Sequence, residues 1–247
     1  MLCWSGMNYD NIISNKDTID NMFNAGAHFG YQRTRRHPSV KPYIFGSKNR
    51  GDIIDLEKTA HLLEEAKTFV KSVAASGKQV LFVGTKPEAR AVVVKEASRV
   101  GMPYVTERWI GGILTNFTEL KKRMDRYQDL MKKKTEGALN VYTKKERGII
   151  DRELAELDKN FGGLMPMKNI PGAVFVVDSR NESIAVTEAI KMNVPVISLS
   201  NSDCDLKLVR YPIVGNDSAT SSIELFVGEI ADAYKDGLKP VDIQIKE

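Results

Sequence analysis

The pattern of apolar and polar positions divides the chain into buried strands and amphipathic helices. Nearly unbroken apolar runs at residues 79–83, 173–177 and 194–199 are typical of strands buried on both faces, and shorter runs lie at 101–105 and 211–214. Apolar residues at helical spacing cover residues 56–75, and further helices are expected after the strands. Strands that alternate with helices predict an α/β fold with a doubly wound, mainly parallel sheet and helices on both faces.

Side chains that can cap a helix predict where the helices begin. Asp17 is expected to cap a short helix over residues 18–24, after a loosely held tail over residues 1–16. Other starts have one capping side chain or the spacing of a capping box, in which a side-chain oxygen accepts a hydrogen bond from the first turn. These starts are Asp55, Thr85 with Glu88, Asn116 with Glu119, Thr143 with Glu146, Ser179 with Glu182, and Asp217 or Ser218.

One segment interrupts the sheet pattern. Between residues 116 and 163 apolar residues recur at spacings of three and four in two blocks, which predicts two helices with matching seams. Such a pair forms an inserted antiparallel coiled-coil hairpin, an arm whose first helix extends about 30 Å. The expected domains are a tail over 1–16, one α/β domain over 17–115 and 164–235, the arm over 116–163, and a tail over 236–247. The seam residues are Phe117, Leu120, Met124, Tyr127, Met131, Ile150, Leu154, Leu157 and Phe161.

Charge is unevenly distributed along the chain. The formal net charge of the 247 residues is +4, but the part from Pro166 onwards is net negative, so the positive charge belongs to the first two thirds. The basic stretch, residues 29–51, concentrates it: six cations and no acid lie between Tyr31 and Arg50. Tyr31, Tyr43 and Phe45 lie among these cations, a combination typical of RNA recognition, although a solvated surface loop is the alternative. The cations are Arg33, Arg35, Arg36, Lys41, Lys48 and Arg50.

The residues offer little chemistry for catalysis. Neither the GxGxxG nor the GxxxxGK[ST] phosphate-binding pattern is present. Residues 84–86, Gly-Thr-Lys, suit an anion at a helix start, which an RNA phosphate or plain helix capping explains equally well. Asp178, Asp203, Asp205 and Asp217 follow predicted strands, where active sites of such folds gather, but no recognised catalytic partner accompanies them. We therefore expect no enzyme, and a nucleotide-binding α/β enzyme is the alternative.

The few cysteines and histidines complete the picture. Cys3 and Cys204 are too few for a disulfide framework and favour a reducing compartment. Their spacing relative to His28 and His37 is not that of metal ligands, so neither a metal nor a cofactor is expected. We expect His28 to be a packed, hydrogen-bonded core residue. No run long enough to span a membrane and no export signal is found, which favours a cytoplasmic protein.

Seven motifs stand out along the chain. They are AGAHFG at 25–30, RxxxxPxxKPYIFG at 33–46, IIDLEKT at 53–59, VLFVGTK at 80–86, RWIGGILTNF at 108–117, VFVVD at 174–178 and GND at 215–217. Together they resemble the family of the bacterial-type small-subunit ribosomal protein S2. They occur in the order found in that family, and the resemblance covers about residues 14–235.

The resemblance implies a flavodoxin-like sheet with an inserted coiled-coil hairpin and a non-enzymatic, structural role in the small ribosomal subunit. It implies binding to small-subunit ribosomal RNA and to neighbouring ribosomal proteins, and in many bacteria docking of the large OB-repeat protein that captures messenger RNA. A bacterial cytoplasmic ribosome is expected rather than an organellar one. Trp109, Ile113 and Phe117 are expected to pack the arm against the sheet. The motifs assign RNA binding to Arg33, Arg35, Arg36, Lys41, Tyr43, Asn49, Arg50, Lys86, Arg90, Arg108, Thr115 and Asn116.

Overall fold

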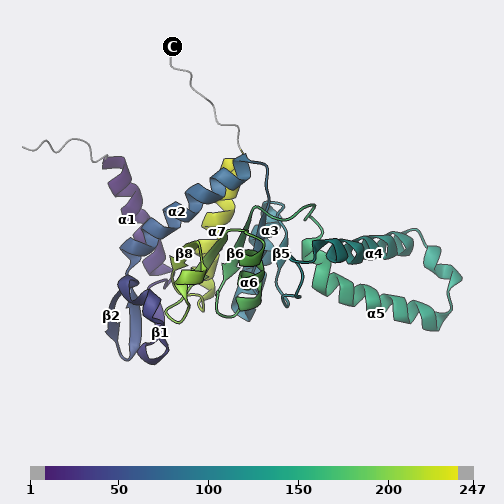
Figure 1. Ribbon diagram of the computed structural model, residues 1–247, viewed down its shortest axis with the longest axis horizontal. Helices are drawn as coiled ribbons and strands as arrows, with labels where there is room; N and C mark the ends of the chain where they lie inside the picture. The colour runs from purple at the N-terminus through teal and green to yellow at the C-terminus, as the bar shows by residue number, and fades with distance from the viewer. Residues whose placement is uncertain (1–8, 239–247) are drawn as a thin grey trace, which may run out of the picture.

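A parallel sheet of five strands forms the centre of the computed structural model, which describes residues 9–238 (Figure 1). The strands lie in the order β5-β4-β6-β7-β8. Among these five, the second strand along the chain is at the edge beside the first, which is the flavodoxin-like order and confirms the predicted fold class. The strands are β4 (Val80–Val83), β5 (Tyr104–Val105), β6 (Ala173–Val177), β7 (Val196–Ser200) and β8 (Tyr211–Val214).

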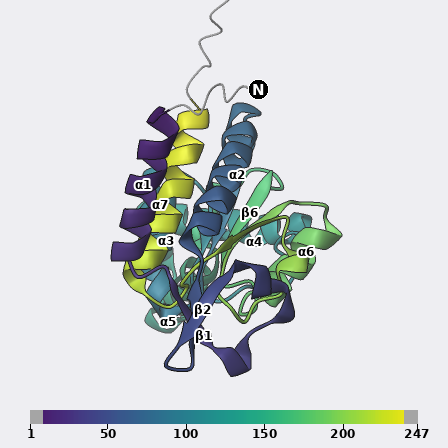
Figure 2. The ribbon, with the colours of Figure 1, turned by 90° about the vertical axis from the view of Figure 1, so that its left-hand side faces the viewer.

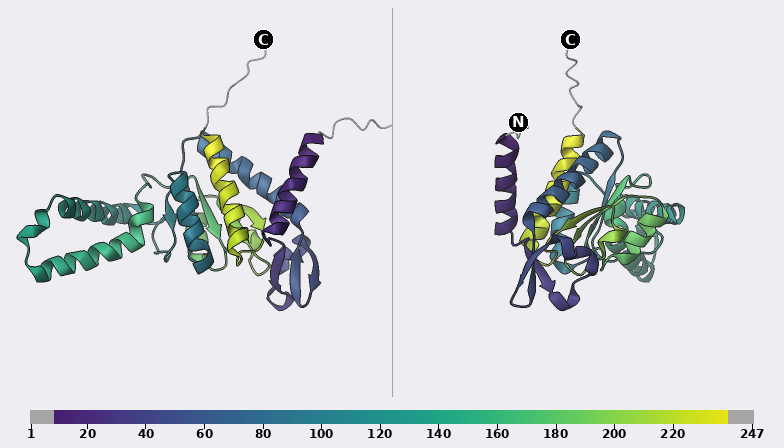
Figure 3. Two further views of the ribbon diagram at one scale, coloured as in Figure 1. Left: turned by 180° about the vertical axis from the view of Figure 1, so that it is seen from behind. Right: turned by 60° about the vertical axis from the view of Figure 1, so that its left-hand side comes forward.

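Helices cover both faces of this sheet, because neighbouring strand residues point to opposite sides. Phe82 and Phe175 pack on one face against α2 (Leu56–Ala75), α3 (Pro87–Arg99) and α7 (Thr220–Gly237). Helix α1 (Tyr9–Asn24) lies outside these helices, and Met22 joins their core (Figure 2). Figure 3 shows α3 and α7 side by side on this face. On the other face, Leu81 and Val174 pack against α6 (Ser183–Lys191) and residues 109–114.

The basic stretch forms a second, small sheet. The sequence indicates only its last strand, because Asp52-Ile53-Ile54-Asp55 resembles a short strand followed by a helix cap. Its strands β1 (Phe29–Gln32), β2 (Ile44–Lys48) and β3 (Gly51–Ile54) are antiparallel, in the order β1-β3-β2. Two short 3-10 helices, η1 (Arg33–Arg35) and η2 (Pro38–Tyr43), connect β1 to β2. Asn49 and Arg50 both have positive φ, 52° and 68°, and make the tight turn between β2 and β3.

Two helices leave the sheet together and project from one end of the molecule, opposite the small sheet (Figure 1). They are α4 (Phe117–Thr135) and α5 (Lys144–Phe161), joined through η3 (Ala138–Val141). Ion pairs between Arg126 and Glu153, at 2.6 Å, and between Lys134 and Asp151, at 2.7 Å, link them along their length. Most seam positions are buried or half-buried between the helices, but Met131 is 41% exposed. Coiled-coil packing of the pair, and the division into a domain and an inserted arm, stay predictions.

Two of the predicted helix starts are confirmed in detail. Asp55 accepts hydrogen bonds from the backbone N–H groups of Glu57 and Lys58 at the start of α2. Thr143 and Glu146 form a complete capping box at the start of α5. Among the described residues, the side chains of Asp55 and Thr143 have hydrogen-bond or ion-pair partners only in the first turn of their own helix, so their oxygens are available for capping.

The other starts lack the predicted side-chain cap, although α4 begins directly after Asn116 as expected. Helix α1 begins at Tyr9, so Asp17 lies within it, and the predicted tail over 1–16 is wrong for residues 9–16. Thr85 and Asn116 make no capping bond, and α6 and α7 begin after Glu182 and Ala219 without a side-chain cap. The reason is tertiary: the Thr85 hydroxyl donates to Glu182, so both groups are used between elements. Helix α7 continues to Gly237, and residues 239–247 lie outside the described part.

The end of α5 lies directly against the sheet, and the two backbones are too close there to leave room for a side chain. Gly163 lies in η4 (Gly162–Leu164), and a Cβ atom there would be 2.5 Å from the carbonyl oxygen of Tyr104 in β5. Such a distance is far below van der Waals contact, so only glycine lets the two backbones approach.

We expect Gly163→Ala to lower the free energy of unfolding by about 1–3 kcal/mol, because the added methyl must displace the backbone of β5. Gly148→Ala is the matched control. Gly148 lies within α5, and a Cβ atom there would meet nothing within 4 Å. There alanine should stabilise by about 0.5–1 kcal/mol. Urea unfolding of both variants tests this, and equal effects of the two substitutions would contradict it.

Candidate nucleic-acid interface

The basic stretch lies across the carboxyl ends of β6, β7 and β8 and is attached there by backbone contacts. The N–H of Tyr31 donates to Ser202 Oγ at 3.0 Å, and the N–H of His37 donates to the Ser202 carbonyl at 2.8 Å. Ser39 Oγ accepts from the N–H of Leu206 at 3.1 Å. The stretch is therefore a folded surface with a fixed position on the main sheet, which excludes a flexible arm.

The six cations of the basic stretch divide into one that is half-buried and ion-paired and five that are exposed. The Arg36 guanidinium binds the Asp52 carboxylate through two nitrogens, and the Asp52 side chain is fully buried. Hydrogen bonds from Arg36 lower the pKa of Asp52 despite its burial. Arg36 thus neutralises a carboxylate inside the small sheet, and an RNA contact at this position is unsupported. The exposed cations, none with an ion pair to a carboxylate in the described chain, are Arg33, Arg35, Lys41, Lys48 and Arg50.

The aromatic side chains of the basic stretch also differ in role. Tyr31 is half-buried, with the guanidinium of Arg35 5.7 Å and the ammonium of Lys86 5.9 Å from its ring centre. Tyr43 packs against the small core that includes Val40, so it does not offer a free ring for a base. Phe45 is 79% exposed. Of the three rings, only that of Phe45 is fully available to a partner.

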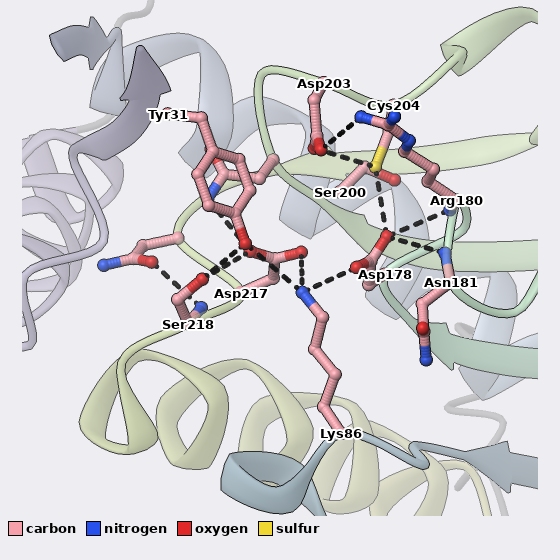
Figure 4. A network of polar contacts seen from close by, with 12 residues as sticks. Tyr31, Lys86, Asp178, Arg180, Asn181, Ser200, Asp203, Cys204, Asp217 and Ser218 are labelled. Atoms are coloured by element: carbon pink, nitrogen blue, oxygen red, sulfur yellow. Dashed lines mark hydrogen bonds and ion pairs between the residues drawn. The ribbon is translucent and has the colours of Figure 1, made fainter. Parts of the chain in front are cut away.

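Lys86 lies at the carboxyl end of β4 between two carboxylates (Figure 4). Its ammonium is 2.6 Å from Asp178 Oδ2 and 2.8 Å from Asp217 Oδ2, and its side chain is only 16% exposed. Burial would lower the pKa of Lys86, but Asp217 and Asp178 raise it above its ordinary value. The pKa of Asp217 is raised, because burial outweighs the attraction of Lys86. The ammonium is used inside the protein, so the RNA contact expected from Gly-Thr-Lys is unsupported.

The remaining polar groups of this crevice also serve the fold. Asp178 has a φ of 68° and its Oδ1 accepts from the N–H groups of Arg180 and Asn181, which makes a tight turn after β6. Burial raises the pKa of the Cys204 thiol to about 12. A thiol with that pKa stays protonated at neutral pH and is a poor nucleophile. Carboxylates and thiol together therefore form a structural cluster.

The segment RWIGGILTNF is organised by one carboxylate that the sequence analysis missed, Glu188 of α6. It accepts from the indole N–H of Trp109 at 3.2 Å and from the backbone N–H groups of Gly112, Leu114 and Thr115 at 2.7, 3.2 and 3.3 Å. Burial opposes its ionisation, but these donors lower its pKa. The sequence carries a signal for it, since Glu188 is the one acid on the otherwise apolar, buried side of α6.

The remaining predicted RNA-binding positions lie away from the basic stretch. Arg108 and Asn116 are exposed where the arm leaves the sheet, and Thr115 donates its hydroxyl to Glu188 at 3.2 Å. Arg90 donates to the Thr85 carbonyl at 3.0 Å and lies 3.4 Å from the Glu107 carboxylate. The twelve positions therefore fall on the small sheet and around the base of the arm, except Lys86, which lies in the crevice at the end of β4. Trp109 and Ile113 are buried and Phe117 half-buried, in the core expected for them.

His28 is packed as predicted but lacks the hydrogen bond predicted with it. Its ring lies between Phe23 and Phe29, at centre distances of 4.5 and 4.0 Å. Its Nδ1 atom is buried without a partner, and burial lowers the pKa of the ring. Because two aromatic rings enclose the imidazole, no polar group reaches that nitrogen, and His28 is a neutral packing residue.

Neither a membrane-spanning helix nor a metal-binding cluster is found in residues 9–238. No helix in this range has the length and apolar composition needed to cross a membrane. Within the same range, no three histidine, cysteine, aspartate or glutamate side chains come together as a metal site. Cys3 lies outside it.

The fold and its crevice define a class: a doubly wound α/β protein whose usual ligand-binding crevice is filled by its own side chains. Comparison with known proteins makes the class specific. The family model for ribosomal protein S2 matches residues 22–237. The small ribosomal subunit protein uS2 of Trichormus variabilis is 44% identical over 220 residues, which are 89% of this chain and 83% of that protein. That of Geotalea uraniireducens is 42% identical over 229 residues, 93% and 90% of the two chains.

The chain belongs to the ribosomal protein S2 family. The resemblance of the motifs is confirmed, and so is the expectation that the protein is not an enzyme, because the family consists of structural proteins of the ribosome. The alternative of a nucleotide-dependent enzyme is excluded.

Glu188→Gln is expected to lower the free energy of unfolding at pH 7 by about 1–3 kcal/mol. The single amide oxygen of glutamine cannot accept all the hydrogen bonds that Trp109 and the backbone of residues 112–115 donate to the carboxylate. The lowered pKa sets the pH dependence: the contribution of Glu188 is complete above its unfolded pKa of about 4.3 and is lost as the pH falls through its folded pKa. Urea unfolding between pH 7 and 3 should show the two proteins converging. Glu224→Gln, at an exposed ion pair with Lys95, is the control and should change little. A constant gap at all pH values would contradict the assignment.

Lys86→Gln is expected to lower the free energy of unfolding at pH 7 by about 3–5 kcal/mol, because it leaves two buried carboxylates without a counter-charge. The deficit should shrink as the pH falls toward the raised pKa of Asp217, since a protonated carboxyl needs no counter-charge. Lys41→Gln, at an exposed unpaired lysine, should change stability by less than about 0.5 kcal/mol. Thermal or urea unfolding measures both. Equal stability of the two variants would show that Lys86 is not structural.

Proposed function

We propose that the protein is a structural constituent of the small ribosomal subunit that binds ribosomal RNA through its small sheet. The observation that carries the proposal is the set of five exposed cations without carboxylate partners on a rigid surface. Unpaired cations attract a polyanion, and a fixed framework lets them match the spacing of phosphates in folded RNA. The names of the relatives, small ribosomal subunit proteins, support the same assignment.

A second RNA contact is proposed at the base of the arm. Arg108 and Asn116 are exposed there, and Glu188 holds the loop between them in one conformation. The two contact regions lie at different places along the longest axis of the molecule (Figure 1). Contacts at two places would fix both position and orientation, and the arm would add contacts with neighbouring ribosomal proteins.

Docking of the large OB-repeat protein that captures messenger RNA is the finer part of the proposal. It is supported by an aromatic surface formed by Phe23, Phe29 and Phe45, which are 59, 58 and 79% exposed. Asp55 and Glu57 line the hollow beside these rings, so the surface suits a protein better than an RNA backbone. The proposed location is the ribosome of a bacterial cytoplasm, in line with the bacterial sources of the relatives.

The test is the triple substitution of Arg33, Arg35 and Lys41 by glutamate in a tagged full-length chain. Three phosphate contacts should be replaced by repulsion, so we expect the share of protein that sediments with small subunits at physiological salt to fall at least tenfold. Gradient sedimentation of lysates measures this share, and thermal unfolding checks that the fold is intact.

Charge alone is controlled by a matched triple substitution. Lys71, Lys78 and Lys235 are exposed at the opposite end of the main sheet, near the amino ends of its strands. Their replacement by glutamate makes the same change in net charge and should leave sedimentation unchanged. Normal sedimentation of the first variant, or an equal loss in both, would overturn the RNA-binding assignment.

A further inference from the structure

A cavity of 480 Å³ lies between the basic stretch and α6, outside the carboxyl ends of β6 and β7. Doubly wound sheets bind their ligands on this side. Its volume is within the range of pockets that accept small organic groups, about 300–1,000 Å³. The cavity, called here the Leu208 cavity, is lined by Arg35, Arg36, His37, Pro38, Ser179, Arg180, Ser183, Val186, Thr187, Asp203, Asp205 and Leu208.

The walls of the Leu208 cavity combine an apolar surface with a cationic rim. Pro38, Val186 and Leu208 supply the apolar part, and Leu208 is 55% exposed although it is a large aliphatic side chain. Arg35 and Arg180 supply the rim and come from different elements, η1 and the loop before α6. A ligand that fits must therefore be flat or apolar in one part and anionic in another.

The two carboxylates of the lining are already bound by groups of the protein, and they balance part of the positive charge of the rim. Asp203 accepts from the Arg180 guanidinium at 2.9 Å. Asp205 accepts from the backbone N–H of Lys207 at 3.0 Å and lies 3.8 Å from His37 Nδ1. Arg35 makes no ion pair within residues 9–238, and the Arg180 side chain is 63% exposed despite its bond to Asp203. Arg35 can therefore donate directly to a phosphate, and the exposed Arg180 side chain can donate to it through the nitrogens that Asp203 does not use.

We propose that the Leu208 cavity receives one unstacked nucleotide of the bound RNA. The base lies on Pro38, Val186 and Leu208, and the adjoining phosphate meets Arg35 and Arg180. This inference rests on the proposed RNA-binding function and specifies one of its contacts. The decisive point is the apolar wall: an RNA helix presents phosphates and hydroxyls to a protein, and only a base turned out of a loop or bulge offers a face for apolar contact.

Continuity with the basic stretch selects RNA over an acidic peptide. Arg35 belongs both to the rim of the cavity and to the row of unpaired cations that includes Arg33 and Lys41. A strand that follows those cations therefore meets the cavity at Arg35. By contrast, a hollow beside α2 has two glutamates, Glu64 and Glu65, and one arginine, Arg210, in its lining.

The test fills the cavity without changing its charge. Thr187 lies on the wall formed by α6, and Thr187→Trp places an indole where the base would lie. Ile184→Trp is the matched control, because Ile184 is exposed on the same helix but does not line the cavity. Purified full-length proteins are bound to protein-free small-subunit ribosomal RNA at physiological salt. Affinity and the chemical reactivity of each nucleotide are then measured.

Wild-type protein and Ile184→Trp should bind alike and change the reactivity of the same one or two unpaired nucleotides. Thr187→Trp should bind about tenfold or more weakly, the usual effect of losing one stacked base, and leave those nucleotides as reactive as in free RNA. Unchanged affinity and reactivity in Thr187→Trp would overturn the cavity as a nucleotide site while leaving the proposed function in place. Absence of RNA binding by the wild type would overturn the proposed function itself. If Thr187→Trp impaired only incorporation into subunits, with RNA protection intact, a protein segment would occupy the cavity and the inference would also be wrong.

Discussion

The ion pairs of Lys86 with Asp178 and Asp217 are the contact on which the arrangement of the molecule depends. They join the turn after β4, the end of β6 and the turn after β8 at a point where three parallel strands deliver their carboxyl ends. Tyr31 closes the group from the small sheet, and its hydroxyl lies 2.7 Å from Ser218 Oγ (Figure 4). The Lys86 ammonium also lies 3.5 Å from the Tyr31 hydroxyl, so it adds a link between the two sheets to the backbone bonds at Ser202. Removal of either the cation or a carboxylate would leave a desolvated charge without its partner, which costs free energy of folding.

The same cluster explains how a fold with a ligand crevice serves as a scaffold. In doubly wound proteins the carboxyl ends of the strands usually surround a cofactor or nucleotide. Here that space between β4, β6 and β8 holds side chains of the protein, and exposed unpaired cations lie further out, on η1, η2 and the β2–β3 turn. In the proposed function, binding takes place on the small sheet above the crevice and not at the centre of the crevice. A protein of this family accordingly acts as a structural component and catalyses no reaction.

Much of the main sheet was predictable from the sequence, because periodicity reports burial. The strand and helix ranges around Phe82, Phe175 and Leu63 follow from unbroken or regularly spaced apolar residues, and so does the seam of the arm. Capping failed where the polar side chain has a distant partner, as Thr85 has in Glu182, since local spacing contains no information on tertiary contacts.

Two strands of the small sheet, β1 and β2, escaped prediction because they have four or five residues and several polar ones. The site was only half predictable for the same physical reasons. Composition identified the basic stretch, but it could not separate Arg36, bound to buried Asp52, from exposed Arg33. The order of strands has a consequence for how the chain is made. Strand β4 pairs with β5 on one side, but its other partner, β6, follows the whole of α4 and α5. During synthesis β4 therefore waits with an open edge while both arm helices emerge, and local helix formation outpaces closure of the sheet. The rate at which the fold is completed therefore depends on the late, long-range pairing of β4 with β6. Until β6 arrives, the open edge of β4 can pair with a strand of another chain.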